Sequence, residues 1–166
     1  GMHIMCIEAA RQIYGFSCNS EEFEPDAKHP IISIVDEDSK NMGGTMKLGL
    51  HKTYITKSNN GSLTTAYKCY SDIECEQKKD IEYIYERHRH RYEVNPKYKD
   101  ALSSKLFFSG NDTEEQCIDI VEITNHKFYI GCQYHPEFQS HLHKPSPLFN
   151  GLVKTCLKNP IMNVVE

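Results

Sequence analysis

The six residues QYHPEF (133–138) place a histidine and a glutamate two positions apart, directly after the apolar run FYIGC (128–132). At the exit of a buried strand, His135 would point into a cleft, as functional residues of open α/β sheets do. Glu137 could accept a hydrogen bond from one ring nitrogen and leave the other free as a base. The pair therefore predicts two members of a nucleophile–histidine–carboxylate site; a surface histidine in a proline turn is the alternative.

The segment ERHRHRYEVNP (86–96) is the second candidate, because it repeats cationic residues along a β-prone stretch. Strict alternation predicts two faces, one with Arg87, Arg89, Arg91 and Glu93, the other with His88, His90, Tyr92 and Val94. A row of guanidinium groups suits an anion, either a carboxylate held by paired hydrogen bonds or phosphate groups. A solvated edge strand protected by its charge is the competing interpretation.

Three weaker signals accompany these segments. The stretch GGTMKLG (43–49) has the glycines, hydroxyl and lysine of a mobile lid or phosphate-contacting loop, but not the spacing of a P-loop. Two carboxylates of NSEEF (19–23) would by themselves indicate a capping or solvated acidic turn. A metal site built from His135, His141 and His143 lacks an acid or cysteine at a recognised spacing, so we predict no metal.

Composition limits the remaining possibilities. The 166 residues suffice for one domain with a real core, and 39% hydrophobic with 25% charged residues is ordinary for a globular protein. A formal charge of −4 does not favour nucleic acid, and no apolar run reaches the length of a membrane helix. The seven cysteines are odd in number, scattered and without a CxxC pair, which favours buried thiols in a reduced, cytoplasmic protein.

The periodicity predicts a mixture of helices and strands, and hence an α/β fold. We expect an amphipathic helix over 2–14 that ends at Gly15, and a helix over 146–158 capped by Ser146. The buried stripe of the second helix would be Leu148, Leu152, Val153 and Cys156. Other expected elements are strands at 30–35, 43–50, 81–94, 106–109, 117–124 and 128–134, a helix over 96–105, and a polar surface excursion over 57–80 with a short helix at 62–70.

Four segments, taken in order, resemble the C-terminal glutamine amidotransferase domain of CTP synthases: GGTMKLG (43–49), ERHRHRYEVNP (86–96), QYHPEF (133–138) and KPSPLFNGLVK (144–154). The HPE element alone would indicate class I glutamine amidotransferases in general, and RHRHRYEVN and PSPLF narrow the resemblance to CTP synthases. It implies that 1–158 form the C-terminal part of this domain, with 57–80 as an insertion and 159–166 as a tail.

The resemblance implies a Cys–His–Glu triad that hydrolyses L-glutamine to glutamate and ammonia. His135 would match the general base and Glu137 the carboxylate that orients it. Glu22 falls where the family has a glutamate that holds the substrate, and Arg91 where it has an arginine on the substrate glutamine. An amino acid offers a carboxylate to a guanidinium and an ammonium to a carboxylate, which suits these two residues.

The family's nucleophile lies in a G-x-C-L-G-M-Q motif at a sharp turn from a strand into a helix. Gly1, Met2 and His3 resemble the last three residues of this motif and would help to bind glutamine, with His3 in place of the usual glutamine. The cysteine would then lie two positions before Gly1, and the 166 residues alone are expected to be inactive. The implied fold is flavodoxin-like, with a mostly parallel central sheet whose first strands are missing. Gly1 as a purification scar before an initiator Met2 is the alternative.

The same resemblance gives expectations for the parent enzyme. Gly43, Gly44 and Lys47 would belong to a lid tied to activation by GTP, with Lys47 replacing the usual arginine. The domain itself would need no cofactor, whereas ATP and Mg²⁺ would serve a synthetase domain that aminates UTP in a homotetramer. A different class I amidotransferase, a γ-glutamyl hydrolase, or a non-catalytic domain that binds anions or nucleotides are the alternatives.

Overall fold

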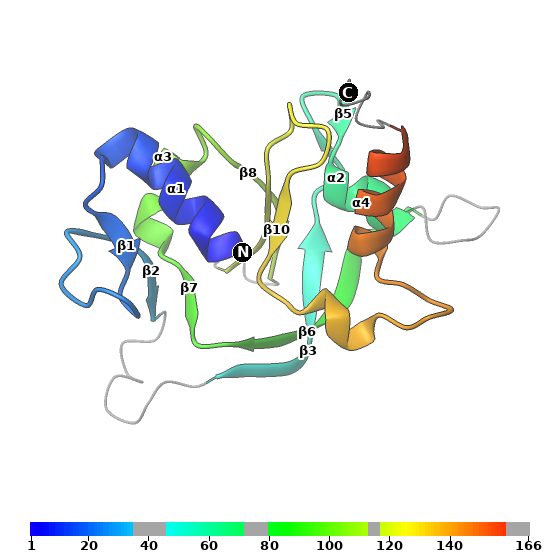
Figure 1. Cartoon of the computed structure of the whole chain (residues 1–166), viewed down its shortest axis with the longest axis horizontal. Helices are drawn as coiled ribbons and strands as arrows, with labels where there is room; N and C mark the ends of the chain where they lie inside the picture. Colours follow the sequence, from blue (N-terminus) through cyan, green and yellow to red (C-terminus); the bar gives the residue numbers. More distant parts are fainter. Residues whose placement is uncertain (35–45, 72–79, 113–116, 159–166) are drawn as a thin grey trace, which may run out of the picture.

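A computed structural model describes residues 1–34, 46–71, 80–112 and 117–158, and mixes helices with two main sheets (Figure 1). The helices are α1 (Met2–Tyr14), α2 (Thr65–Ser71), α3 (Lys99–Leu102) and α4 (Pro147–Lys158), with 3₁₀ turns η2 (Pro96–Tyr98) and η3 (Pro136–Gln139). The strands are β1 (Cys18–Ser20), β2 (His29–Ile34), β3 (Lys47–Ile55), β4 (Ser58–Asn59), β5 (Ser62–Leu63), β6 (Tyr83–His90), β7 (Tyr92–Val94), β8 (Phe107–Asn111), β9 (Ile118–Glu122) and β10 (Ile130–Cys132). The predicted glycines of the lid, Gly43 and Gly44, and the predicted tail over 159–166 lie outside the described residues.

Most strand pairs in the described part of the chain are antiparallel, unlike the mostly parallel sheet that we expected. The larger sheet has the order β10–β9–β8–β3–β6 and is antiparallel throughout, and the smaller sheet has the order β1–β2–β7. Only β1 and β2 run parallel among these pairs. Parallel neighbours need a crossover of a dozen or more residues, and the short connections β8–β9 and β9–β10 do not allow one. The α/β class itself is confirmed.

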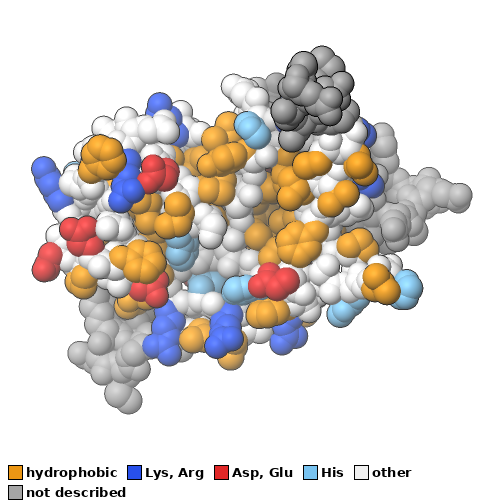
Figure 2. Space-filling model, viewed as in Figure 1, with side chains coloured by type: hydrophobic (Ala, Val, Ile, Leu, Met, Phe, Trp, Pro, Cys, Tyr) orange, Lys and Arg blue, Asp and Glu red, His pale blue; other side chains and the backbone are white. Residues whose placement is uncertain are grey.

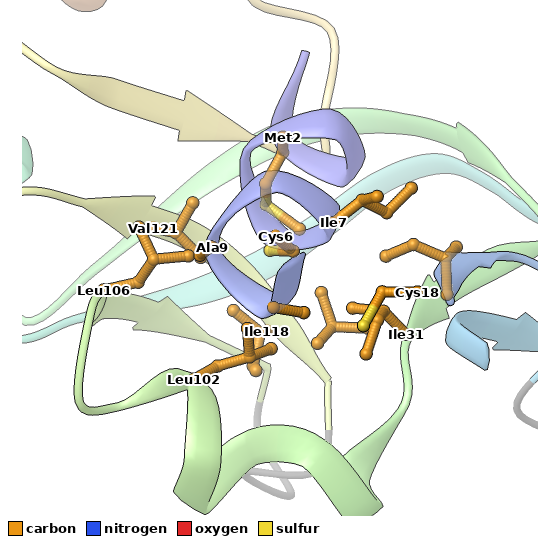
Figure 3. Packing of buried hydrophobic residues seen from close by; sticks show 13 residues of the cluster. Met2, Cys6, Ile7, Ala9, Cys18, Ile31, Leu102, Leu106, Ile118 and Val121 are labelled. Carbon is orange, nitrogen blue, oxygen red and sulfur yellow. The ribbon is translucent and has the colours of Figure 1, made fainter. Parts of the chain in front are cut away.

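Helix α1 packs between the two sheets and organises the first core (Figures 1 and 3). Figure 3 shows Ala9 beside Val121 of β9 and Leu106, and Met2 and Cys6 belong to the same cluster. The helix ends as predicted, because Gly15 adopts φ 78° and donates its N–H to Arg11 O at 2.9 Å. The predicted amphipathic character is confirmed, because Met2, Cys6, Ile7, Ala9 and Ala10 are buried while Ile4, Ile13 and Tyr14 are exposed.

A second core lies between the larger sheet and helices α2 and α4. It contains Ile120 of β9, whereas Val121, the next residue, belongs to the first core, because successive strand residues face opposite sides. Helix α2 forms close to the position predicted for a short helix. However, its residues Ala66, Tyr67 and Tyr70 are buried, so this part of the predicted surface excursion is a piece of the core.

Helix α4 differs from its predicted packing. Leu148 is buried as expected, but Leu152 is 45% exposed, Val153 is 55% exposed and Cys156 is exposed. The predicted cap also differs, because the buried hydroxyl of Ser146 has no hydrogen-bond partner and only its backbone carbonyl accepts from Asn150 N–H. A helical stripe shows that a face is apolar, but not which part of it a neighbour covers.

No helix in the described ranges is long and apolar enough to cross a membrane.

The approach of α1 to β10 can be tested with Gly131→Ala. A Cβ at this position would overlap Met5 Sδ and lie 3.1 Å from Met2 Cα. We expect the free energy of unfolding to fall by about 1–3 kcal/mol, because α1 cannot retract without opening the first core. Urea unfolding followed by circular dichroism measures the change.

Met5→Ala supplies the matched control, since it removes the sulfur that the added methyl group would meet. The double variant should therefore lose less than the sum of the two single variants. Wild-type stability in Gly131→Ala would contradict the close packing of α1 on β10.

Candidate functional site

The turn after β10 carries the histidine and the glutamate that the sequence singles out. His135 immediately precedes the 3₁₀ turn η3, and its Nδ1 lies 2.7 Å from Glu137 Oε1. Pro136 fixes the first position of η3, where a missing N–H does no harm. The His135 ring stacks on Phe138 with centroids 4.8 Å apart, so it is held on one side by packing and on another by a carboxylate. The predicted hydrogen-bonded geometry is therefore present.

A cavity of about 560 Å³ opens beside this histidine. Besides residues 132–135 and Met46, three segments that are far apart in the sequence line it: the start of α1, the turn after β1, and the junction of β6 with β7. Of the predicted site residues, the cavity brings together Gly1, Met2, His3, Glu22, Arg91 and His135. Figure 2 shows histidine and acidic side chains next to each other near the middle of this face, with Lys and Arg side chains along its lower edge.

The arginine strand follows the predicted alternation only up to its end. Residues 83–89 of β6 alternate exposed and buried, with Arg87 and Arg89 exposed. The chain bends at Arg91 and enters β7 in the other sheet, so Glu93 is buried instead of sharing the arginine face. Because of this bend, both Arg89 and Arg91 line the cavity, while Arg87 does not.

His3, at the start of α1, is tied to the strand that leads to His135. Its Nε2 lies 3.1 Å from Gln133 Oε1, and Gln133 Nε2 donates to Tyr92 O at 2.7 Å. Since the amide nitrogen of Gln133 is used as a donor, its oxygen accepts and His3 Nε2 carries the proton. Burial lowers the pKa of His3, while the bond to Gln133 and the charge of Glu22 act in the opposite direction. Neutral His3 is thus a hydrogen-bonding group that faces the cavity.

Lys47, which we assigned to the lid, does not line this cavity. It begins β3, and its Nζ lies 3.5 Å from Oδ1 of Asp119, a fully buried residue that also accepts from Thr53 Oγ1 at 2.7 Å. Burial raises the pKa of Asp119 to about 6, against the opposing effects of Lys47 and Thr53. The adjacent Met46 is the described residue of this segment that reaches the cavity.

A thiol nucleophile is not provided by the described cysteines near the site. Cys132 lines the cavity, but burial raises the pKa of its thiol to about 12, and its Sγ donates to Tyr134 O at 3.5 Å. Cys6 lies on the buried side of α1, and burial raises its pKa to about 12 as well. A thiol at such a pKa is protonated near neutral pH and reacts poorly.

Sequence reasoning assigned no role to Gln133 and His90, which also line the cavity. The position of Gln133 within QYHPEF was a usable signal, because it stands at the end of a strand. No group of three or more His, Cys, Asp or Glu side chains that could hold a metal ion occurs among the described residues. The arrangement instead offers a base, a carboxylate that orients it, and opposite charges for a zwitterion: Glu22 for an ammonium, and Arg89 and Arg91 for a carboxylate.

Comparisons with known proteins agree with this arrangement. The sequence model of the family "Glutamine amidotransferase class-I" matches residues 1–155. The chain is 42% identical over 162 residues to CTP synthase from Aquifex aeolicus and 41% identical over 162 residues to CTP synthase from Halalkalibacterium halodurans. Each match covers 95% of this chain and 28% of the relative. The chain thus spans less than a third of the length of these relatives.

A solved structure is also similar: the "Trypanosoma brucei CTPS - glutaminase domain with bound acivicin". Its TM-score is 0.79 at 34% sequence identity, and the match covers 95% of this chain and 58% of that chain. Such a likeness in both fold and sequence confirms the resemblance that the four segments of the sequence indicated.

The half-buried His90 at the edge of the cavity predicts an acid-dependent loss of stability. Burial, followed by the charges of Lys47 and His3, lowers the pKa of His90 from 6.5 to about 3. Between pH 6.5 and 3, His90 therefore binds a proton in the unfolded chain but not in the folded chain. The free energy of unfolding falls as the pH drops through this range. In His90→Gln this slope should shrink by up to about 1.4 kcal/mol per pH unit.

Unfolding free energies at pH 7.5 and 5 measure this effect. His141→Gln, at an exposed position, serves as the control and should keep the wild-type slope. Equal slopes for His90→Gln and wild type would show that folding does not lower the pKa of His90.

Proposed function

Because the chain belongs to the class I glutamine amidotransferase family, we propose that it carries the base half of the glutamine-hydrolysing site of a CTP synthase. The observation that carries this proposal is the 2.7 Å contact between His135 Nδ1 and Glu137 Oε1 beside a cavity with both charges needed for an amino acid. The family and the named relatives support the reaction, and the geometry supports the assignment of His135 and Glu137 to it.

In this proposal the cavity binds L-glutamine through its α-amino and α-carboxylate groups. Glu22 would pair with the ammonium, and Arg91, assisted by Arg89, with the carboxylate, because a guanidinium binds a carboxylate through two parallel hydrogen bonds. The side-chain amide would then extend past His3 and Gly1 toward His135, since all of these groups line one cavity.

The nucleophile in this proposal is a cysteine encoded two positions before Gly1. Helix α1 begins at Met2 with Gly1 as its N-cap, so a thiolate at that point would lie at the positive end of the helix. Backbone N–H groups of the first turn lack partners within a helix and could stabilise the oxyanion. The side chains of Cys6 and Cys132, which are protonated near neutral pH, do not fit this role.

The proposed reaction has two steps. The thiol gives its proton to His135 Nε2, the thiolate attacks the amide carbon, and the C–N bond breaks as that proton passes to the leaving ammonia. A water molecule then loses a proton to His135 Nε2 and attacks the thioester, which releases glutamate and restores the thiol. Glu137 keeps the proton on Nδ1, so that Nε2 remains the nitrogen that exchanges protons.

We propose that the ammonia serves a synthetase domain of the same polypeptide, where ATP and Mg²⁺ activate UTP for amination to CTP. A homotetramer in the cytoplasm, activation by GTP, and a lid that contains Gly43 and Gly44 complete this proposal for the parent enzyme. This part of the proposal rests on the named relatives alone. The chain covers only 28% of their length, so the rest of such an enzyme lies outside it.

The proposal predicts that His135→Ala lowers glutamine hydrolysis by about 10²- to 10⁴-fold, the usual contribution of a general base. The measurement is glutamate release from L-glutamine by the polypeptide that includes the residues preceding Gly1. Circular dichroism should show an unchanged fold, because His135 is only half-buried.

His141→Ala removes a histidine six positions farther along, at an exposed site outside the cavity, and is the matched control. Its turnover should equal that of wild type. Undiminished hydrolysis by His135→Ala would remove His135 from the mechanism.

A further inference from the structure

A buried carboxylate behind the site connects both ends of the turn that carries His135 and Glu137. Glu86 of β6 is 4% exposed and does not line the cavity. Its Oε1 accepts from Tyr70 OH at 2.7 Å, and its Oε2 accepts from Gln139 Nε2 at 2.7 Å. Each carboxylate oxygen therefore serves a different element: helix α2 on one side and the last residue of η3 on the other.

The bond to Tyr70 continues to the residue before His135. Tyr70 OH and Tyr134 OH lie 2.9 Å apart, and both rings are buried. Because the Tyr70 hydroxyl gives its proton to Glu86, the Tyr134 hydroxyl is the donor in the second bond. Burial raises the pKa of both tyrosines well above the usual value, so each remains a donor near neutral pH.

Gln139 closes the network from the other end of the turn. Its Nε2 donates to Glu86 and also to Tyr85 O at 2.9 Å, which fixes the amide against β6. Between these two ends, the backbone N–H of His135 donates to Arg87 O at 2.9 Å. The segment from Tyr134 to Gln139 is thus attached to three consecutive residues of β6.

We propose that Glu86 is a positioning residue for glutamine hydrolysis, holding the His135–Glu137 pair in register with the cavity through Tyr70, Tyr134 and Gln139. The inference rests on the proposed function. A displacement of a reacting group by about 1 Å can lower the rate of the catalysed reaction about 10²-fold. Hydrogen bonds that belong to one buried network also strengthen each other. A carboxylate offers a separate acceptor oxygen to each partner here, whereas an amide would present one oxygen and one NH₂ group.

The test exchanges the acceptor Glu86 and the donor Gln139, singly and together, in the polypeptide that includes the residues preceding Gly1. In Glu86→Gln the amide oxygen can still accept from Tyr70, but its NH₂ group faces the NH₂ group of Gln139. We expect kcat for glutamine hydrolysis to fall about 10- to 100-fold, while KM stays within about twofold because Glu86 does not touch the cavity. Gln139→Glu alone should reduce kcat similarly, because two carboxylates would then face each other.

The double variant Glu86→Gln/Gln139→Glu restores a donor opposite an acceptor. It should recover part of the lost kcat, which general destabilisation would not do. Tyr70→Phe, which removes a single hydroxyl, tests the other arm and should also lower kcat at unchanged KM. Thermal unfolding accompanies each assay to show that the variants are folded.

The outcomes separate the two proposals. No glutamate release by wild type would overturn the proposed function itself. Active wild type with unchanged kcat in both Glu86→Gln and Tyr70→Phe would overturn the role of Glu86. Losses in the single variants without recovery in the double variant would also overturn it, since the network would then matter only for folding.

Discussion

The backbone hydrogen bond from His135 N to Arg87 O, 2.9 Å long, joins the turn after β10 to the middle of β6, and the site depends on this junction. Strand β6 contains Arg87 and His88 at this point, and its next residue, Arg89, lines the cavity. The chain then bends at Arg91, which also lines the cavity. Strand β6 and the residue that follows it therefore supply both the support for the His135 turn and the two arginines that line the cavity. Any shift of β6 would displace both together.

The larger sheet supports this junction with polar contacts as well as apolar packing. Asp119 of β9 is fully buried and lies near Thr53 and Lys47 of β3, and its Oδ1 is 4.0 Å from His88 Nδ1. Burial, followed by the charge of Lys47, lowers the pKa of His88 to about 3, so its ring is neutral near pH 7. A neutral His88 ring beside His51 and Tyr134 spares the interior an additional charge, which would be costly to bury.

The sequence predicts best the features that depend on neighbouring residues. Helix 2–14 and its Gly15 end follow from local periodicity, and the His135–Glu137 contact follows from two residues beside a proline. Strand direction, the burial of α2 and the exposed stripe of α4 depend on which distant segments pair or pack, and local spacing carries no such information. The assembly of Glu22, Arg91 and Gly1 was reached only through the family resemblance, and Gln133 was missed although its place directly after β10 was a usable signal.

The location of the nucleophile tests the account most directly. The measurement is glutamate release from L-glutamine by the polypeptide that includes the residues preceding Gly1, compared between two alanine variants. Replacement of the cysteine expected two positions before Gly1 should abolish release, whereas Cys132→Ala should retain it, because burial keeps the Cys132 thiol protonated near neutral pH. Loss of activity in Cys132→Ala, with full activity in the other variant, would contradict the account.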